Sequence, residues 1–121
     1  MSILPLRLRM RMLEKNRNTL GNIGLGLRYA LVKTIARSCG DNVAIYPGVY
    51  LFNPQNISIG NNVSIHSMSY LDSGPDNGCG ISIGNDVSIA HGVTIMATTH
   101  IYTDNDLPIK DQGVETKSVC I

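Results

Sequence analysis

Aliphatic residues recur every six positions through most of this chain, and that period is the feature that most restricts its fold. An amphipathic helix needs apolar residues about 3.6 positions apart, and a strand with one buried face needs simple alternation, so neither explains a lasting period of six. Turn-forming residues fill the gaps, which makes each hexad one short strand and one corner. Two rows carry the period: Ile45, Leu51, Ile59, Ile65, Leu71, Ile83, Ile89, Ile95 and Ile101, and, two positions earlier, Val43, Val49, Ile57, Val63, Ile81, Val87 and Val93.

A chain of short strands and corners can bury these rows only by coiling, so that successive turns stack about 4.8 Å apart and hydrogen-bond to one another. The segment ISIGNNVSI at 57–65 is copied almost unchanged as ISIGNDVSI at 81–89. Three hexads fill one turn of a triangular coil, so the copies share one face only if about one further hexad leaves the coil between them. The segment DSGPDNGCG at 72–80 is the predicted excursion. The stacked pairs are then Ile59 with Ile83, Ile65 with Ile89, and Leu71 with Ile95.

With these repeats, residues 41–121 resemble the hexapeptide-repeat acyltransferases, and within them the maltose, galactoside and polysaccharide O-acetyltransferase group. The resemblance rests on the hexads together with VSIAHGVTIMATTH at 87–100, a polar loop at 101–117 and the renewed coil SVCI. It implies an all-β solenoid, a left-handed parallel β-helix. The left hand comes from the resemblance alone, because periodicity does not reveal handedness and such crossovers are normally right-handed. The expected organisation is a basic N-terminal helical arm at 1–40 and a β-helix at 41–121 with loops at 72–80 and 101–117.

The same resemblance implies an activity, the transfer of an acetyl group from acetyl-CoA to a hydroxyl of a sugar or of a surface-polysaccharide precursor. It also implies a homotrimer with active sites between neighbouring subunits. The pattern begun by SVCI calls for further coils, so we expect a C-terminally truncated chain that stops early at Ile121. Similar enzymes hold much of the acetyl-CoA site in those later coils, and no cofactor-binding residue is assigned here. A non-catalytic, truncated trimeric β-helix scaffold is therefore the alternative function.

His100 is the candidate catalytic residue, because it ends IMATTH directly before the loop 101–117. Acyl transfer to an alcohol needs a base, and a neutral imidazole near pH 7 can take the hydroxyl proton. The resemblance implies that His100 occupies the position of the family's catalytic histidine. The alternative is a loop histidine that only caps a corner.

Two further residues are candidates for substrate binding. His66 lies at a corner where the galactoside and maltose enzymes carry an asparagine that touches substrate, so this chain departs from their pattern. It either hydrogen-bonds an acceptor or cofactor, or is a plain exposed corner residue. Asp72 is predicted to stack beneath Met96, on the side from which His100 emerges. Its assigned role is to bind the acceptor or to orient the histidine.

A zinc site of the carbonic anhydrase type, found on some left-handed β-helices, is a weaker alternative. Ligands of that family include a closely spaced pair of histidines, whereas the three histidines here are separated by 25 and 9 positions. The predicted stacking puts His66 and His91 at one corner and His100 at another. No metal ligand is therefore assigned, and His91 is interpreted as a structural corner residue.

Charge is divided sharply between the two parts of the chain. Residues 1–40 hold eight of the ten Lys and Arg against one acid, whereas 41–121 hold two bases and eight acids. Apolar spacing over 23–38 predicts an amphipathic helix that ends by Gly40 and covers the first coil, whose strand edges would otherwise be open. A second interpretation is contact between the basic N-terminal arm and a membrane surface through LRLRMRML. GNIGLG at 21–26 is predicted to be a flexible join.

Composition argues against several other classes of protein. Three cysteines, Cys39, Cys79 and Cys120, cannot all pair with one another and show no CxxC spacing, which favours a reduced, cytoplasmic location. No apolar run has the length of a signal peptide or of a membrane span. Nucleic acid is not an expected partner, because the chain offers one Phe and five Tyr and no basic surface interleaved with aromatic residues.

Overall fold

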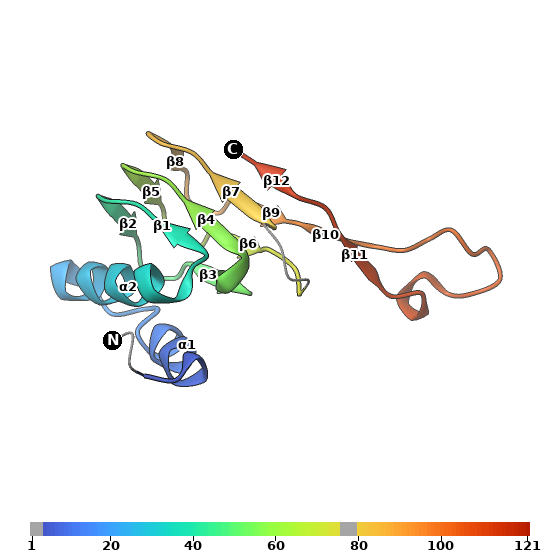
Figure 1. Cartoon of the computed structure of the whole chain (residues 1–121), viewed down its shortest axis with the longest axis horizontal. Helices are drawn as coiled ribbons and strands as arrows, with labels where there is room; N and C mark the ends of the chain where they lie inside the picture. Colours follow the sequence, from blue (N-terminus) through green and yellow to red (C-terminus); the bar gives the residue numbers. More distant parts are fainter. Residues whose placement is uncertain (1–3, 76–79) are drawn as a thin grey trace.

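The computed structural model describes residues 4–75 and 80–121, so part of the predicted excursion, 76–79, lies outside the described residues, Cys79 included. Within the described ranges, two α-helices precede a stack of short strands (Figure 1). The helices are α1 (Leu6–Lys15) and α2 (Gly21–Ile35). The strands are β1 (Ser38–Cys39), β2 (Val43–Ile45), β3 (Tyr50–Phe52), β4 (Ile57–Ile59), β5 (Val63–Ile65), β6 (Tyr70–Asp72), β7 (Ile81–Ile83), β8 (Ser88–Ile89), β9 (Thr94–Met96), β10 (Thr98–His100), β11 (Val114–Thr116) and β12 (Val119–Cys120).

Consecutive strands of the described chain fall in turn into three parallel sheets. The orders are β1-β4-β7-β12, β2-β5-β8 and β3-β6-β9, and β10 with β11 forms a separate antiparallel pair. The predicted pairs are confirmed: Ile59 lies opposite Ile83, Ile65 opposite Ile89, and Leu71 opposite Ile95. From β1 to β9, each strand is thus hydrogen-bonded to the strand three places away in the chain. This arrangement of short strands is compatible with the β-helix-like fold that the period of six predicts.

The coils are longer than three hexads. Val43 pairs with Val63, two positions beyond three hexads, and Ile57 pairs with Ile81, one whole hexad beyond them. The additional length of the first coil belongs to a turn of 3₁₀ helix, η1 (Pro54–Asn56), entered through Asn53 at a φ of 53°. Proline fixes its own φ and has no N–H to donate, so this corner cannot continue as a strand. The additional length of the second coil lies in the excursion after β6.

The aliphatic rows line the inside of the coils. Ile45, Ile65, Leu71 and Ile81 are at most 1% exposed, and the residues between the buried ones in each strand point outward. Each such side chain stabilises the fold by about 1.5–3 kcal/mol through burial. Leu31, Val32 and Ile35 of α2 belong to the same core. The prediction that a helix covers the first coil is therefore confirmed.

Two predictions about the arm are wrong in detail. GNIGLG is not a flexible join, because α2 begins at Gly21. Glycine here permits a close approach: a Cβ at Gly24 would collide with the carbonyl oxygen of Thr19. The helix also ends at Ile35 and not near Gly40, because the backbone N–H of Arg37 already donates to the carbonyl oxygen of Ile57 at 2.9 Å. β1 consequently starts before the expected boundary between arm and β-helix.

One corner of the coils is aligned by a ladder of side chains. Asn42, Asn62 and Asp86 stand one above another with φ values of 56°, 57° and 58°, a left-handed conformation that Asn and Asp adopt more readily than most residues. The Asn42 amide donates to Oδ1 of Asn62, and the Asn62 amide donates to Oδ1 of Asp86, both at 2.8 Å. The turn signals Gly-Asn-Asn and Gly-Asn-Asp thus fix both the corner and the stacking of successive coils.

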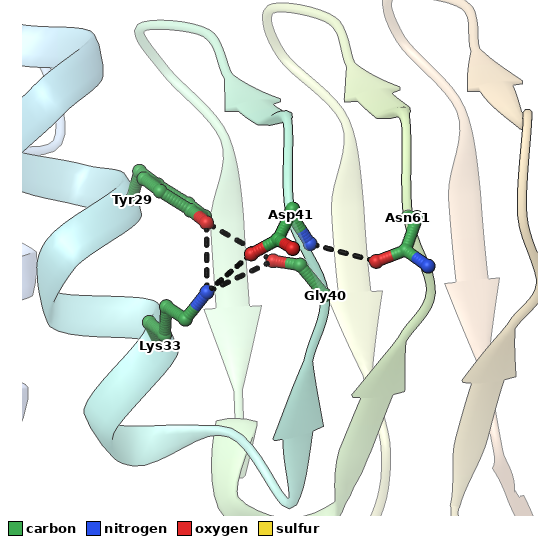
Figure 2. Close-up of polar contacts among 5 residues, drawn as sticks. All are labelled: Tyr29, Lys33, Gly40, Asp41 and Asn61. Atoms are coloured by element: carbon green, nitrogen blue, oxygen red, sulfur yellow. Dashed lines mark hydrogen bonds and ion pairs between the residues drawn. The ribbon is translucent and has the colours of Figure 1, made fainter.

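The second helix is attached to this same corner. Figure 2 shows Tyr29 and Lys33 of α2 facing the chain at Gly40 and Asp41. The Tyr29 hydroxyl donates to the Gly40 carbonyl at 3.1 Å, and Lys33 Nζ lies 2.9 Å from a carboxylate oxygen of Asp41. The Asp41 backbone N–H in turn donates to Oδ1 of Asn61 at 2.8 Å. These contacts fix α2 over the first coil. None of the described helices has the length and apolar character needed to cross a membrane.

Candidate functional site

His100 lies where the chain leaves the three sheets. It is the last residue of β10 and is paired with Val114 of β11. The two strands lead into a ribbon, with a short 3₁₀ turn η2 (Ile109–Asp111), that extends away from the stacked strands (Figure 1). The loop expected at 101–117 therefore leaves the coil, although its last part returns as a paired strand. The His100 side chain is exposed and forms no hydrogen bond, ion pair or ring contact with the described residues, so its imidazole is open to a ligand.

His66 occupies the corner between β5 and β6. Its backbone N–H donates to the Ile89 carbonyl at 3.0 Å, which holds the corner against the next coil. Its ring stacks on Tyr46, with the ring centroids 4.7 Å apart and the planes 9° apart. Such a stacked pair contributes about 0.5–1.5 kcal/mol beyond simple burial. One face of the imidazole is thus covered by Tyr46, and only its edge and remaining surface can meet a ligand.

His91 shares the corner of His66, one coil later. The Gly92 N–H donates to the carbonyl of Ser67 at 3.1 Å, which ties the two turns together. The predicted separation of the histidines, with His66 and His91 at one corner and His100 elsewhere, is confirmed. Within 4–75 and 80–121, no group of three His, Cys, Asp or Glu residues is placed to hold a metal ion.

Asp72 is the last residue of β6 and lies opposite Met96 of β9, as predicted. Its Oδ1 accepts hydrogen bonds from the Gly74 backbone N–H at 3.0 Å and from the Asn53 side-chain amide at 3.4 Å. Gly74 has a φ of 82° and packs tightly against Thr98 and Thr116 at the base of the ribbon. The Asp72 carboxylate therefore fixes the turn on which the ribbon base rests, a structural task that it can perform without substrate.

Sequence reasoning missed an aromatic cluster beside Asp72, on the outer face of the third sheet. Tyr50 and Tyr70 stack with ring centroids 6.1 Å apart, and Phe52 lies 4.8 Å from Tyr70. The guanidinium of Arg17 sits 4.0 Å from the centre of the Tyr50 ring. The available signal was alternation, because YLF and YLD pair in register and the residues flanking an inward leucine must point outward. Arg17 covers one face of the Tyr50 ring, whereas Phe52 is 40% exposed and can meet a ligand.

The three predicted site residues do not meet within one chain. His66 lies at the corner before β6, Asp72 at the opposite end of that strand, and His100 on the ribbon. Among the residues that the structure describes, their side chains make no hydrogen bond, ion pair or ring contact with one another. A site that uses all three therefore needs residues from a second copy. No protein-family model, curated protein or solved structure matches this chain.

Proposed function

We propose that this chain is an O-acetyltransferase that moves an acetyl group from acetyl-CoA to a hydroxyl of a sugar or of a polysaccharide precursor. The proposed architecture is a left-handed parallel β-helix of the hexapeptide-repeat acyltransferase family. The observation that supports it is the order of elements along the chain. Hexads stack in register up to β9, a ribbon that carries the exposed His100 follows, and the chain then returns to the first sheet at β12. This is the order of coil, histidine loop and renewed coil that the resemblance implies.

In this proposal His100 is the general base. The neutral imidazole accepts the proton of the acceptor hydroxyl while the oxygen forms a bond with the thioester carbonyl carbon. The C–S bond then breaks, and the departing thiolate takes the proton back from the imidazolium. Acetyl-CoA supplies the activated acyl group as a co-substrate, and no described residue is assigned to hold it. The openness of the His100 side chain to a ligand supports its part in this scheme.

The proposed active unit is a homotrimer in which His100 of one subunit faces the His66 corner of the next. The separation of the two histidines within one chain supports a shared site. Flat sheet faces with a repeated surface also suit symmetric packing. Asp72 would reach the acceptor through Oδ2, because Oδ1 already holds the turn at Gly74.

A non-catalytic trimeric β-helix scaffold is the second candidate. The specific observation in its favour is that Asp72 and His66 already have structural partners, in the Gly74 turn and on the Tyr46 ring. A scaffold requires only the stacked coils and an outer face, and it makes no use of an accessible imidazole at position 100. The two candidates therefore differ in what removal of that imidazole does.

The test is release of free CoA from acetyl-CoA with a panel of sugars, measured by chromatography so that protein thiols do not interfere. The variants are His100→Ala and, as a matched control, His91→Ala, because both side chains are exposed. We expect sugar-dependent release that falls about 100-fold or more in His100→Ala and is unchanged in His91→Ala. Equal release by wild type and His100→Ala would reject His100 as the base. Failure of wild type to bind CoA at millimolar concentration would favour the scaffold.

A further inference from the structure

The outer face of α1 carries a stripe of unpaired positive charge. Arg7, Arg11 and Lys15 follow one another at every fourth position and are exposed. At about 3.6 residues per turn, they lie on the side of the helix away from the buried Leu13. None of the three forms an ion pair or hydrogen bond with any residue in 4–75 or 80–121, and Glu14 is the one acid of the helix. Glu14 is exposed on the same side of the helix, three positions after Arg11, but it forms no ion pair with the stripe, which keeps a net positive charge.

Not every basic residue of the helix belongs to that stripe. The Arg9 guanidinium instead donates to the backbone carbonyls of Leu4 and Thr34. These bonds place the start of α1 beside the end of α2, so the two helices form an antiparallel hairpin. Arg9 therefore serves the fold, whereas Arg7, Arg11 and Lys15 are free for a partner.

Exposed aliphatic side chains lie at both ends of the basic stripe. Leu8 is 43% exposed beside the stripe at the start of α1, and Leu20 and Ile23 are 76% and 75% exposed where the hairpin turns into α2. Exposing large aliphatic groups to water brings no benefit to the folded chain by itself. Cations flanked by aliphatic groups are the combination by which an amphipathic helix lies in the interface of an anionic membrane.

We propose that the outer face of the helical hairpin, defined by Arg7, Leu8, Arg11, Lys15, Leu20 and Ile23, binds the surface of an anionic lipid bilayer. The cations would meet lipid phosphates, and the aliphatic side chains would enter the boundary between headgroups and acyl chains. Figure 1 shows the hairpin at the end of the stack opposite β12 and the ribbon. The acidic ribbon, with Asp104, Asp106, Asp111 and Glu115, therefore points away from the bound surface.

Nucleic acid is the competing polyanion, and the aliphatic residues distinguish the two. A phosphate backbone attracts the same cations but offers no apolar layer to Leu20 and Ile23. Single-stranded nucleic acid is bound largely through aromatic stacking, and α1 contains no aromatic residue. The membrane proposal is also independent of acetyl transfer, because it uses neither His100 nor the ribbon.

The test is co-sedimentation of the full chain with sucrose-loaded vesicles of phosphatidylcholine alone or with 30 mol% phosphatidylglycerol, at 50 and 500 mM NaCl. We expect binding to the anionic vesicles at low salt and its loss at high salt. Arg7→Gln with Arg11→Gln should weaken the partition coefficient about 30-fold, at about fivefold for each cation. Leu20→Ser with Ile23→Ser should weaken it about tenfold. All four positions are exposed, so the variants are expected to melt like wild type.

Lys110→Gln with Lys117→Gln is the matched control, since it removes the same charge from the ribbon. It should leave vesicle binding unchanged within about twofold, because the ribbon faces away from the bilayer. The proposal is overturned if anionic vesicles do not sediment the chain, or if the control loses as much binding as the α1 variant. It is also overturned if the variant with Leu20→Ser and Ile23→Ser binds anionic vesicles as tightly as wild type does. In that case, equally strong binding of wild type and this variant to polyuridylate would identify a nucleic-acid surface instead.

Discussion

Replacement of Arg28 by methionine is expected to destabilise the fold by about 3–5 kcal/mol, because Arg28 joins the helical hairpin to the first coil from a fully buried position. The residue is 1% exposed. Its Nε donates to the carbonyl oxygen of Ile45 at 2.6 Å, and its Nη1 donates to the carbonyl oxygens of Thr19 at 2.7 Å and Asn16 at 3.1 Å. One guanidinium therefore satisfies three backbone acceptors from two parts of the chain.

The magnitude follows from those three bonds and from the cost of burying the cation. A hydrogen bond from a charged donor contributes about 1.5–3 kcal/mol, so three contribute about 4.5–9 kcal/mol. Desolvation opposes this, and burial lowers the pKa of Arg28 for the same reason, because a charged group is less stable away from water. Methionine recovers that cost, which includes a buried Nη2 without a partner, and fills most of the volume. It leaves the carbonyls of Ile45 and Thr19 without the Arg28 donor, whereas the Asn16 carbonyl keeps the Thr19 backbone N–H at 3.3 Å. The net loss is then about 3–5 kcal/mol, a large part of the roughly 5–15 kcal/mol typical of a domain.

The assay is urea unfolding followed by far-ultraviolet circular dichroism, with Arg37→Met as the matched control because Arg37 is exposed. Arg28→Lys, which keeps the charge but has one nitrogen, should fall between wild type and Arg28→Met. The control should change the free energy of unfolding by less than about 0.5 kcal/mol. If Arg28→Met unfolds within about 1 kcal/mol of the control, the three carbonyls do not depend on the guanidinium and the reasoning fails.

Two further predictions concern the corner ladder and the thiols. Asn62→Ala should lower the free energy of unfolding by about 2–3 kcal/mol, because it removes two hydrogen bonds and places an alanine at a φ of 57°. Asn62→Gly should lower it by about 1 kcal/mol less, because glycine adopts this φ without strain. Equal losses for the two variants in chemical denaturation would exclude the backbone contribution. In a Cys79→Ser background, Cys120 should be alkylated by iodoacetamide at pH 7.5 before Cys39. The reason is that burial raises the pKa of the Cys39 thiol and so lowers its thiolate fraction. The difference between the two alkylation rates should therefore narrow toward pH 9. Peptide mapping that finds Cys39 modified first would contradict this prediction.

Strand pairing was predictable from the sequence because it depends on a local pattern. The aliphatic positions of each hexad indicate which residues point inward, and the copies at 57–65 and 81–89 indicate which hexads stack on each other. A register error of one residue would turn every buried isoleucine outward, so the pattern excludes such a slip within each stacked pair. Asp72 beneath Met96 follows from the same rule.

The remainder depends on contacts between distant segments, which no local pattern encodes. The helix start at Gly21 is set by the close approach of Thr19, and the helix end by backbone pairing with the first coil. The candidate site was less predictable still. Sequence placed Asp72 and His66 near substrate, but their partners, the Gly74 turn and the Tyr46 ring, come from tertiary structure. From sequence alone, a polar corner residue that binds a ligand cannot be distinguished from one that only hydrogen-bonds or packs within the fold.

The likeness of the two repeated segments has a consequence for how the chain reaches its native state. Ser38 pairs with Ser58, and the same edge could accept Ser82, because β7 repeats the sequence of β4. Closing the longer loop, from position 38 to 82 in place of 38 to 58, costs only about 0.7 kcal/mol more. We therefore expect a coil-skipping error early in refolding, which is corrected later because the omitted turn leaves its isoleucines in water.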